Sequence, residues 1–268
     1  MTLPNYEVFA LRFASTELRS YDGFLLKGDI HDGPLPLDFF IWVIRDDRRT
    51  IVVDTGFGDE ASKRRNRPLI RHPVAALKAI GVDAATVADV VLTHLHYDHS
   101  GNAEFFLSAT FHVQDSEVAY ATGRHMCHPA LSAASDVGNV LDVVRNVYAG
   151  RVCFHDGDEE IAPGVSLHRT GGHTGGMQVV RVHTARGWVA LASDAAHFYL
   201  NFQAGNPFPI VFNIGDVLQG NRILLKLADS PDHIIPGHDP LVMKRYPPHP
   251  ADRDHTVCVH LPPLAELK

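Results

Sequence analysis

The sequence is poor in cysteine, with only three in 268 residues. Cys127, Cys153 and Cys258 lie far apart, and no two of them form a Cys-x-x-Cys pair. Such a sparse, odd-numbered set fits a reducing compartment better than a disulfide framework. We therefore predict a cytoplasmic protein in which the three thiols are buried as small hydrophobic groups.

Positive charge is also scarce. The chain has 24 Lys and Arg against 31 Asp and Glu, a net charge of −7. Because nucleic-acid binding usually needs a basic face, we expect no nucleic-acid partner. The N-terminus lacks a basic segment followed by an apolar run, and no stretch approaches the ~20 apolar residues of a membrane span. We expect neither a signal peptide nor a membrane partner.

Hydrophobic residues make up 45% of the chain and charged residues 21%, which is enough to build an ordinary core. Residues 39–44 and 51–53 are continuously apolar, as is typical of strands covered on both faces. Helices are predicted over 72–81 and 216–227, and the second half partly repeats the strand-rich pattern of the first. The pattern predicts an α/β chain with two layers of sheet, helices outside, and one domain.

Four possible metal ligands, His94, His96, Asp98 and His99, directly follow an apolar strand predicted at 87–93. Imidazole nitrogens and carboxylate oxygens suit zinc, iron or manganese. Alternation along an extended segment places the first three on one side, and a turn could bring His99 into the same cavity. A histidine-rich surface turn is the alternative and would explain a lone His-x-His better. The full pattern after a buried strand favours a metal site, and the spacing could serve two ions.

Three more residues occupy equivalent places. His173 lies in a glycine-rich turn after a strand, Asp194 closes the apolar segment 189–193, and His238 follows the short strand predicted at 233–235. Each comes where a hydrophobic strand ends and a loop begins, which is where ligands projecting from a rigid sheet edge belong. With the first cluster they make the metal-site prediction strong.

These residues make the sequence resemble the metallo-β-lactamase superfamily, from the turn at 54–56 to the loop that contains His238. The resemblance implies an αββα sandwich of two mixed β-sheets flanked by helices, with residues 1–268 as a single hydrolase domain. It also implies two Zn²⁺ ions per chain, with Fe or Mn possible. Asp54 is then not a ligand but orients the metal loop by hydrogen bonds. The implied ligands are His94, His96 and His173 for one ion, Asp98, His99 and His238 for the other, and Asp194 as the bridge.

Within the superfamily the sequence is most similar to lactonases, including the N-acyl-homoserine lactonases of quorum quenching and 4-pyridoxolactonase. This similarity implies a hydrolase that opens a lactone ring through a metal-bridging hydroxide. Asp98 would carry a proton to the departing oxygen. The partner is then a small-molecule lactone or related ester, and the protein a monomer or homodimer.

One departure concerns the residue three positions after the bridging aspartate, which is usually a tyrosine in the acyl-homoserine lactonases. Here His197 stands at that place and Tyr199 follows two residues later. His197 could donate a hydrogen bond to the carbonyl or oxyanion, or be packed behind the ligands. We take His197 and Tyr199 as candidate catalytic residues. The aromatic residues after Asp194 could line an apolar pocket or form ordinary core; they are Phe198, Phe202, Phe208 and Phe212, with Pro209 among them.

Other activities remain open at this point. Thioester hydrolysis of the glyoxalase II type, or amide hydrolysis as in the β-lactamases, would use the same seven ligands. An iron-dependent redox protein would keep much of the pattern, and a non-enzymatic metal-binding protein is a further alternative. The remaining histidines, among them His112 and His155, show no coherent ligand spacing and are predicted to be surface or core residues. His125 and His128 are candidates for substrate contact.

Overall fold

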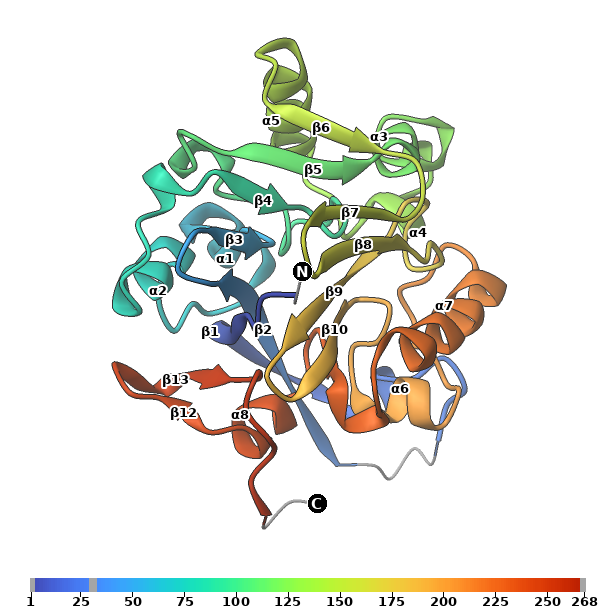
Figure 1. Cartoon of the computed structure of the whole chain (residues 1–268). Helices are drawn as coiled ribbons and strands as arrows, with labels where there is room; N and C mark the ends of the chain where they lie inside the picture. The colour runs from blue at the N-terminus through green and yellow to red at the C-terminus, as the bar shows by residue number, and fades with distance from the viewer. Residues whose placement is uncertain (1–2, 29–32, 266–268) are drawn as a thin grey trace.

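The computed structural model describes residues 3–28 and 33–265. Two mixed β-sheets pack against each other, with helices outside them (Figure 1). The large sheet has the strand order β12-β13-β1-β2-β3-β4-β5-β6, and the small sheet has the order β11-β10-β9-β8-β7. The large sheet consists of β1 (Glu7–Arg19), β2 (Pro34–Arg45), β3 (Thr50–Val53), β4 (Asp89–Val91), β5 (Thr110–Gln114), β6 (Val152–His155), β12 (Pro248–His249) and β13 (Asp252–Cys258). The small sheet consists of β7 (Glu159–Ala162), β8 (Val165–Arg169), β9 (Gln178–Thr184), β10 (Gly187–Ser193) and β11 (Ile234–Pro236).

Strand β2 shows how the sequence builds two hydrophobic cores. Phe40 and Trp42 face the small sheet and join the core between the sheets. Phe39 and Ile41 point the other way, into the core between the large sheet and its helices. Since successive side chains of a strand point to opposite faces, a continuous apolar run is buried on both. The prediction for residues 39–44 is confirmed.

The helices cover the outer faces of the sandwich. Helices α2 and α5 supply buried residues to the outer core of the large sheet, and α7 packs beside the small sheet (Figure 1). The helices predicted over 72–81 and 216–227 are α2 and α7, with ends within two residues of the prediction. The helices are α1 (Asp59–Arg65), α2 (Pro73–Ala79), α3 (Asp115–Ala121), α4 (Pro129–Ser132), α5 (Val137–Tyr148), α6 (Tyr199–Gln203), α7 (Ile214–Leu227) and α8 (Leu241–Arg245). Within the described residues, none of these helices is long and apolar enough to cross a membrane.

Four strands end at the same edge of the sandwich: β4, β8, β10 and β11. The chain leaves β4 into residues 92–99, leaves β8 into the turn at 170–177, leaves β10 at Ser193 and leaves β11 at Pro236. Every ligand predicted from the sequence lies in one of these four connections. The sheets therefore position the candidate site, and the loops carry its side chains.

Candidate metal centre

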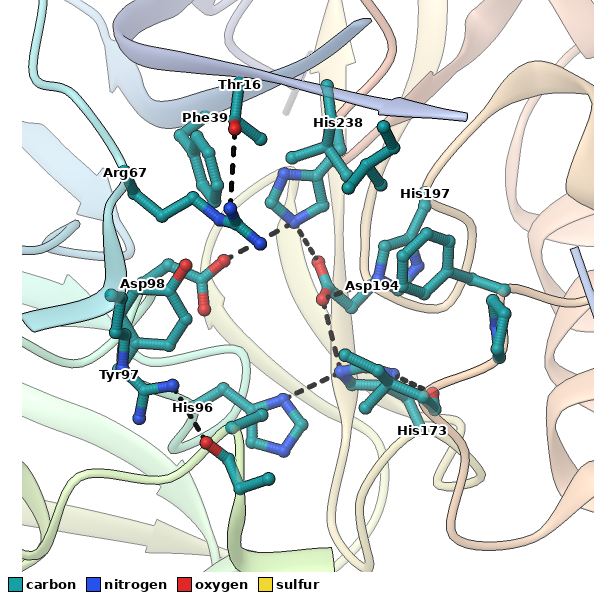
Figure 2. Close-up of a pocket in the computed structure, with 18 of the residues that line it drawn as sticks. Thr16, Phe39, Arg67, His96, Tyr97, Asp98, His173, Asp194, His197 and His238 are labelled. Atoms are coloured by element: carbon teal, nitrogen blue, oxygen red, sulfur yellow. Dashed lines mark hydrogen bonds and ion pairs between the residues drawn. The ribbon is translucent and has the colours of Figure 1, made fainter. Parts of the chain in front are cut away.

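Asp194 lies at the centre of a group of imidazole rings (Figure 2). Its Oδ2 is 3.1 Å from Nε2 of His173 and 3.8 Å from Nε2 of His94. Its Oδ1 is 2.9 Å from Nε2 of His238 and 3.2 Å from Nε2 of His99. The two oxygens of one carboxylate thus face two different pairs of histidines, as expected of a carboxylate shared by two cations.

The other predicted ligands complete the two groups. His96 turns its Nδ1 to within 2.8 Å of Nε2 of His173, on the Oδ2 side of Asp194. Asp98 places Oδ2 3.5 Å from Nε2 of His99 and 3.7 Å from Nε2 of His238, on the Oδ1 side. Within each group the ligand atoms lie within 4.8 Å of one another. The structure brings all seven together.

The outward-facing nitrogens of three rings show that the inward nitrogens are free to bind a cation. His173 donates through Nδ1 to the carbonyl oxygen of Ile210 (2.7 Å). His238 donates through Nδ1 to the carbonyl oxygen of Asp38 (2.8 Å). In His99, Nδ1 faces Oδ2 of Asp54 at 2.7 Å. A neutral imidazole that donates through Nδ1 keeps a lone pair on Nε2. The neighbouring carboxylates, Asp194 first, outweigh burial and raise the pKa of His99 and of His238, so in these two rings a bound cation would take the place of a proton on Nε2.

Burial supports the same donor set. Burial lowers the pKa of His94 and that of His96 well below the usual value, so both rings are neutral at physiological pH. Nε2 of His94, Nε2 of His99 and Oδ1 of Asp194 are buried without a hydrogen-bond partner among the described residues. Buried polar atoms are normally paired, and buried carboxylates are paired or bind metals. Five imidazole rings around two carboxylates, Asp98 and Asp194, fit a pair of divalent cations.

Asp54 holds the first ligand loop, as predicted. This fully buried residue has a φ of +61°, in the left-handed region. It accepts hydrogen bonds from the backbone N–H and the hydroxyl of Thr93, both at 2.8 Å, in addition to its contact with His99. Since Thr93 precedes His94, Asp54 fixes both ends of the loop at 93–99.

Glu117, in α3, was not predicted from the sequence. Its Oε1 accepts the N–H of Leu95 (2.8 Å), and its Oε2 accepts the hydroxyl of Thr174 (2.6 Å) and the N–H of Gly176 (2.8 Å). The side chain is buried and joins the loop of His94 and His96 to the turn of His173. A single acidic residue in a short helix gives no sequence signal that it points inward. A carboxylate accepting three donors between two ligand loops positions those loops.

A pocket of about 480 Å³ opens in front of the centre. The ligands His96, Asp98, His173, Asp194 and His238 line its base. Its lining includes the apolar residues Leu18, Leu37 and Phe39, and also Arg65 and Arg67 beside Tyr97. Its size suits a small organic substrate. Of the predicted aromatic lining, Phe208 and Pro209 reach the pocket, whereas Phe198 and Phe202 belong to the cores.

His197 reaches the site. It lines the pocket, its Nε2 is 3.1 Å from Oδ2 of Asp194, and its ring stacks on Phe208 at 3.9 Å between centroids. Burial lowers the pKa of His197 to about 4, so the ring is neutral and one of its nitrogens carries a proton. The structure therefore brings His197 both to the shared carboxylate and to the pocket.

Tyr199 is not brought to the site, in contrast to the prediction. It is buried in the core, beside Phe202 and under the guanidinium of Arg245, and it does not line the pocket. The physical reason is the start of α6 at Tyr199, which turns its side chain inward. The two other candidates also lie away from the pocket: His125 packs against Tyr120 and Phe212, and His128 is exposed.

Comparison with known proteins agrees with this geometry. The model of the metallo-beta-lactamase superfamily matches residues 39–240. An N-acyl homoserine lactonase from Bacillus sp is 26% identical over 204 residues, covering 70% of this chain and 74% of that protein. The N-acyl homoserine lactonase AiiB of Agrobacterium fabrum is 31% identical over 175 residues, covering 57% of this chain and 61% of that protein.

Solved structures show the same fold. An N-acyl homoserine lactone hydrolase with the product N-hexanoyl-L-homoserine bound at its catalytic metal centre superposes with a TM-score of 0.73 at 23% identity, over 91% of this chain and 96% of that one. AidC, a dizinc quorum-quenching lactonase, gives a TM-score of 0.69 at 17% identity, over 90% of both chains. At these identities the likeness concerns the fold.

Proposed function

The chain belongs to the metallo-β-lactamase superfamily, and we propose that it is a dinuclear metal-dependent hydrolase that opens the ring of a lactone. The observation that carries this proposal is the carboxylate of Asp194, whose two oxygens face two separate groups of ligands. The lactonases among its relatives, with the fold they share, support a lactone as the substrate.

The proposed centre would hold two Zn²⁺ ions. His94, His96 and His173 would hold one ion and Asp98, His99 and His238 the other, with the Asp194 carboxylate shared between them. When bound, such an ion pair lowers the pKa of a bound water and polarises an ester carbonyl.

The chain's own residues place the substrate and move the proton. The apolar residues Leu37 and Phe39 receive the hydrocarbon part of the substrate, and its ester group then lies over the ligands at the base of the pocket. His99 and His238 outweigh the effect of burial and hold the pKa of Asp98 at about 2, so this carboxylate is ionised at neutral pH. Asp98 faces the pocket and can accept a proton and pass it to the departing ring oxygen.

The test is a panel of substrates assayed beside metal analysis. Protein loaded with two equivalents of zinc is expected to open acyl-homoserine and simple lactones, detected with a pH indicator. A chelator is expected to remove the activity and zinc to restore it, because the donor atoms are built around the ions. Cleavage of thioesters without opening of any lactone by the zinc-loaded protein would overturn the proposal.

A His197→Ala variant is expected to lose about 10- to 100-fold in kcat/KM, as is usual when a group that orients a metal ligand is removed. The His197→Gln variant, which keeps an N–H donor, is expected to retain more activity than the alanine variant. His168→Ala, at a histidine on β8 that does not line the pocket, serves as the matched control. Full activity of His197→Ala would show that His197 only packs against Phe208.

A further inference from the structure

A second cluster of ligand-type side chains lies outside the candidate centre. Among residues 3–28 and 33–265, His112, Cys153 and His155 have their ligand atoms within 4.8 Å of one another. His112 is on β5, and the other two are on the neighbouring β6, where Cys153 lies opposite His112 in the register. None of the three lines the pocket in front of Asp194.

Both imidazole rings of this cluster are held by carboxylates on their outer sides. Nε2 of His112 is 3.1 Å from Oδ1 of Asp89, and Nδ1 of His155 is 2.6 Å from Oε2 of Glu159. On the inner side, Nδ1 of His112 and Nε2 of His155 face each other at 3.0 Å. Both histidines are buried.

The contacts with the carboxylates determine whether the inner nitrogens carry a proton or a lone pair. An imidazole nitrogen beside a carboxylate carries the proton, so a neutral ring leaves a lone pair on its other nitrogen. Two lone pairs 3.0 Å apart repel each other unless a cation or a shared proton lies between them. The candidate centre contains the same arrangement, where Nδ1 of His96 faces Nε2 of His173 at 2.8 Å.

The presence of Cys153 favours a metal ion over a shared proton as the group between the two histidines. All three thiols were predicted to be buried, but only Cys258 is; Cys153 is partly exposed and Cys127 is exposed. A shared proton needs no third group, whereas zinc takes thiolate and imidazole ligands together. With Zn–N of about 2.05 Å and Zn–S of about 2.3 Å, tetrahedral geometry sets the two nitrogens ~3.3 Å apart and each ~3.6 Å from the sulfur. The two nitrogens, 3.0 Å apart, are close to this spacing, and the sulfur lies within 4.8 Å of both.

We propose that His112, Cys153 and His155 form a further metal site, separate from the candidate centre, that binds a zinc-type divalent cation. Asp89 and Glu159 orient the two imidazoles, as carboxylates commonly do for metal-binding histidines. The fourth position lies on the partly exposed side of Cys153 and is open to water.

The place of this site in the fold gives it a structural role. Asp89 is on β4, His112 on β5, Cys153 and His155 on β6, and Glu159 on β7. The first three strands belong to the large sheet and β7 to the small one. An ion there fastens the ends of both sheets, so its binding raises the melting temperature without changing the rate of hydrolysis.

Cobalt substitution tests the proposal because the two sites differ in their donor atoms. The ligands of the candidate centre are all nitrogen and oxygen, so only the new site gives a thiolate-to-cobalt charge-transfer band in the near ultraviolet. We expect metal-free protein to bind a third equivalent of Co²⁺ that produces this band. Cys153→Ser is expected to lose the band and the third equivalent but to keep its lactone hydrolysis. The matched control, Cys127→Ser, is expected to keep all three.

A measurement on the unaltered chain covers the case in which Cys153→Ser does not fold. Zn²⁺ is expected to protect Cys153 from alkylation by iodoacetamide, as read by peptide mapping, whereas exposed Cys127 reacts with or without the metal. Two equivalents of Co²⁺ without a thiolate band, or equal alkylation of Cys153 in both conditions, would overturn the proposal and leave a shared proton between the histidines. Neither result depends on whether the protein opens lactones.

Discussion

An Asp194→Ala variant is expected to lose at least about 10³-fold in kcat/KM, on the order of 4 kcal/mol of transition-state stabilisation. The reason is that this one side chain supplies an oxygen to both ligand groups, at 3.1 Å from His173 and 2.9 Å from His238. Its removal leaves two separate histidine groups with no shared anion. Steady-state kinetics on a lactone and metal analysis of the dialysed protein measure the effect.

The Asp194→Asn variant separates charge from shape. Its amide keeps the size of the carboxylate but provides a single oxygen, so we expect one tightly bound ion instead of two and activity between those of the wild type and the alanine variant. Asp158→Ala is the matched control, because Asp158 is exposed and pairs with His168 away from the pocket. Two bound ions and undiminished activity in Asp194→Ala would exclude the shared-carboxylate centre.

The ligand loops could be predicted from the sequence because each follows a buried strand. A polar residue such as His94 or Asp194 immediately after an apolar run has a place in the fold that the chain itself specifies: the edge of a sheet. The apolar runs also indicated strands buried on both faces, and the residues of β2 confirm this. Local pattern and global position agree at these sites.

What could not be predicted depends on contacts between distant segments. The apolar residues at 24–26 form bends and loop rather than a strand, and the N–H of Leu25 donates to the carbonyl oxygen of Pro207. Tyr199 has a promising place in the sequence, yet α6 turns it into the core. His112 and His155 show no ligand spacing, because it is the parallel pairing of β5 and β6 that sets them side by side.

The second large effect is expected at Glu117. A Glu117→Ala variant removes the acceptor of three buried donors, so we expect the free energy of unfolding to fall by about 3–5 kcal/mol. Glu117 accepts hydrogen bonds from Leu95, which lies between His94 and His96, and from Thr174 and Gly176, which follow His173. It therefore supports the ligands of one ion only. Denaturant unfolding and a stepwise zinc titration measure the two consequences.

The zinc titration distinguishes a role of Glu117 in positioning one ligand loop from a general effect on stability. The ion held by His94, His96 and His173 is expected to bind about 10- to 100-fold more weakly in the variant, while the other ion keeps its affinity because Asp54, not Glu117, fixes His99. Glu117→Gln keeps the volume but turns an N–H donor toward other donors, so it should resemble the alanine variant. Asp115→Asn, at the exposed start of the same helix, is the control. If both ions weaken equally, Glu117 supports the fold as a whole rather than one ligand loop.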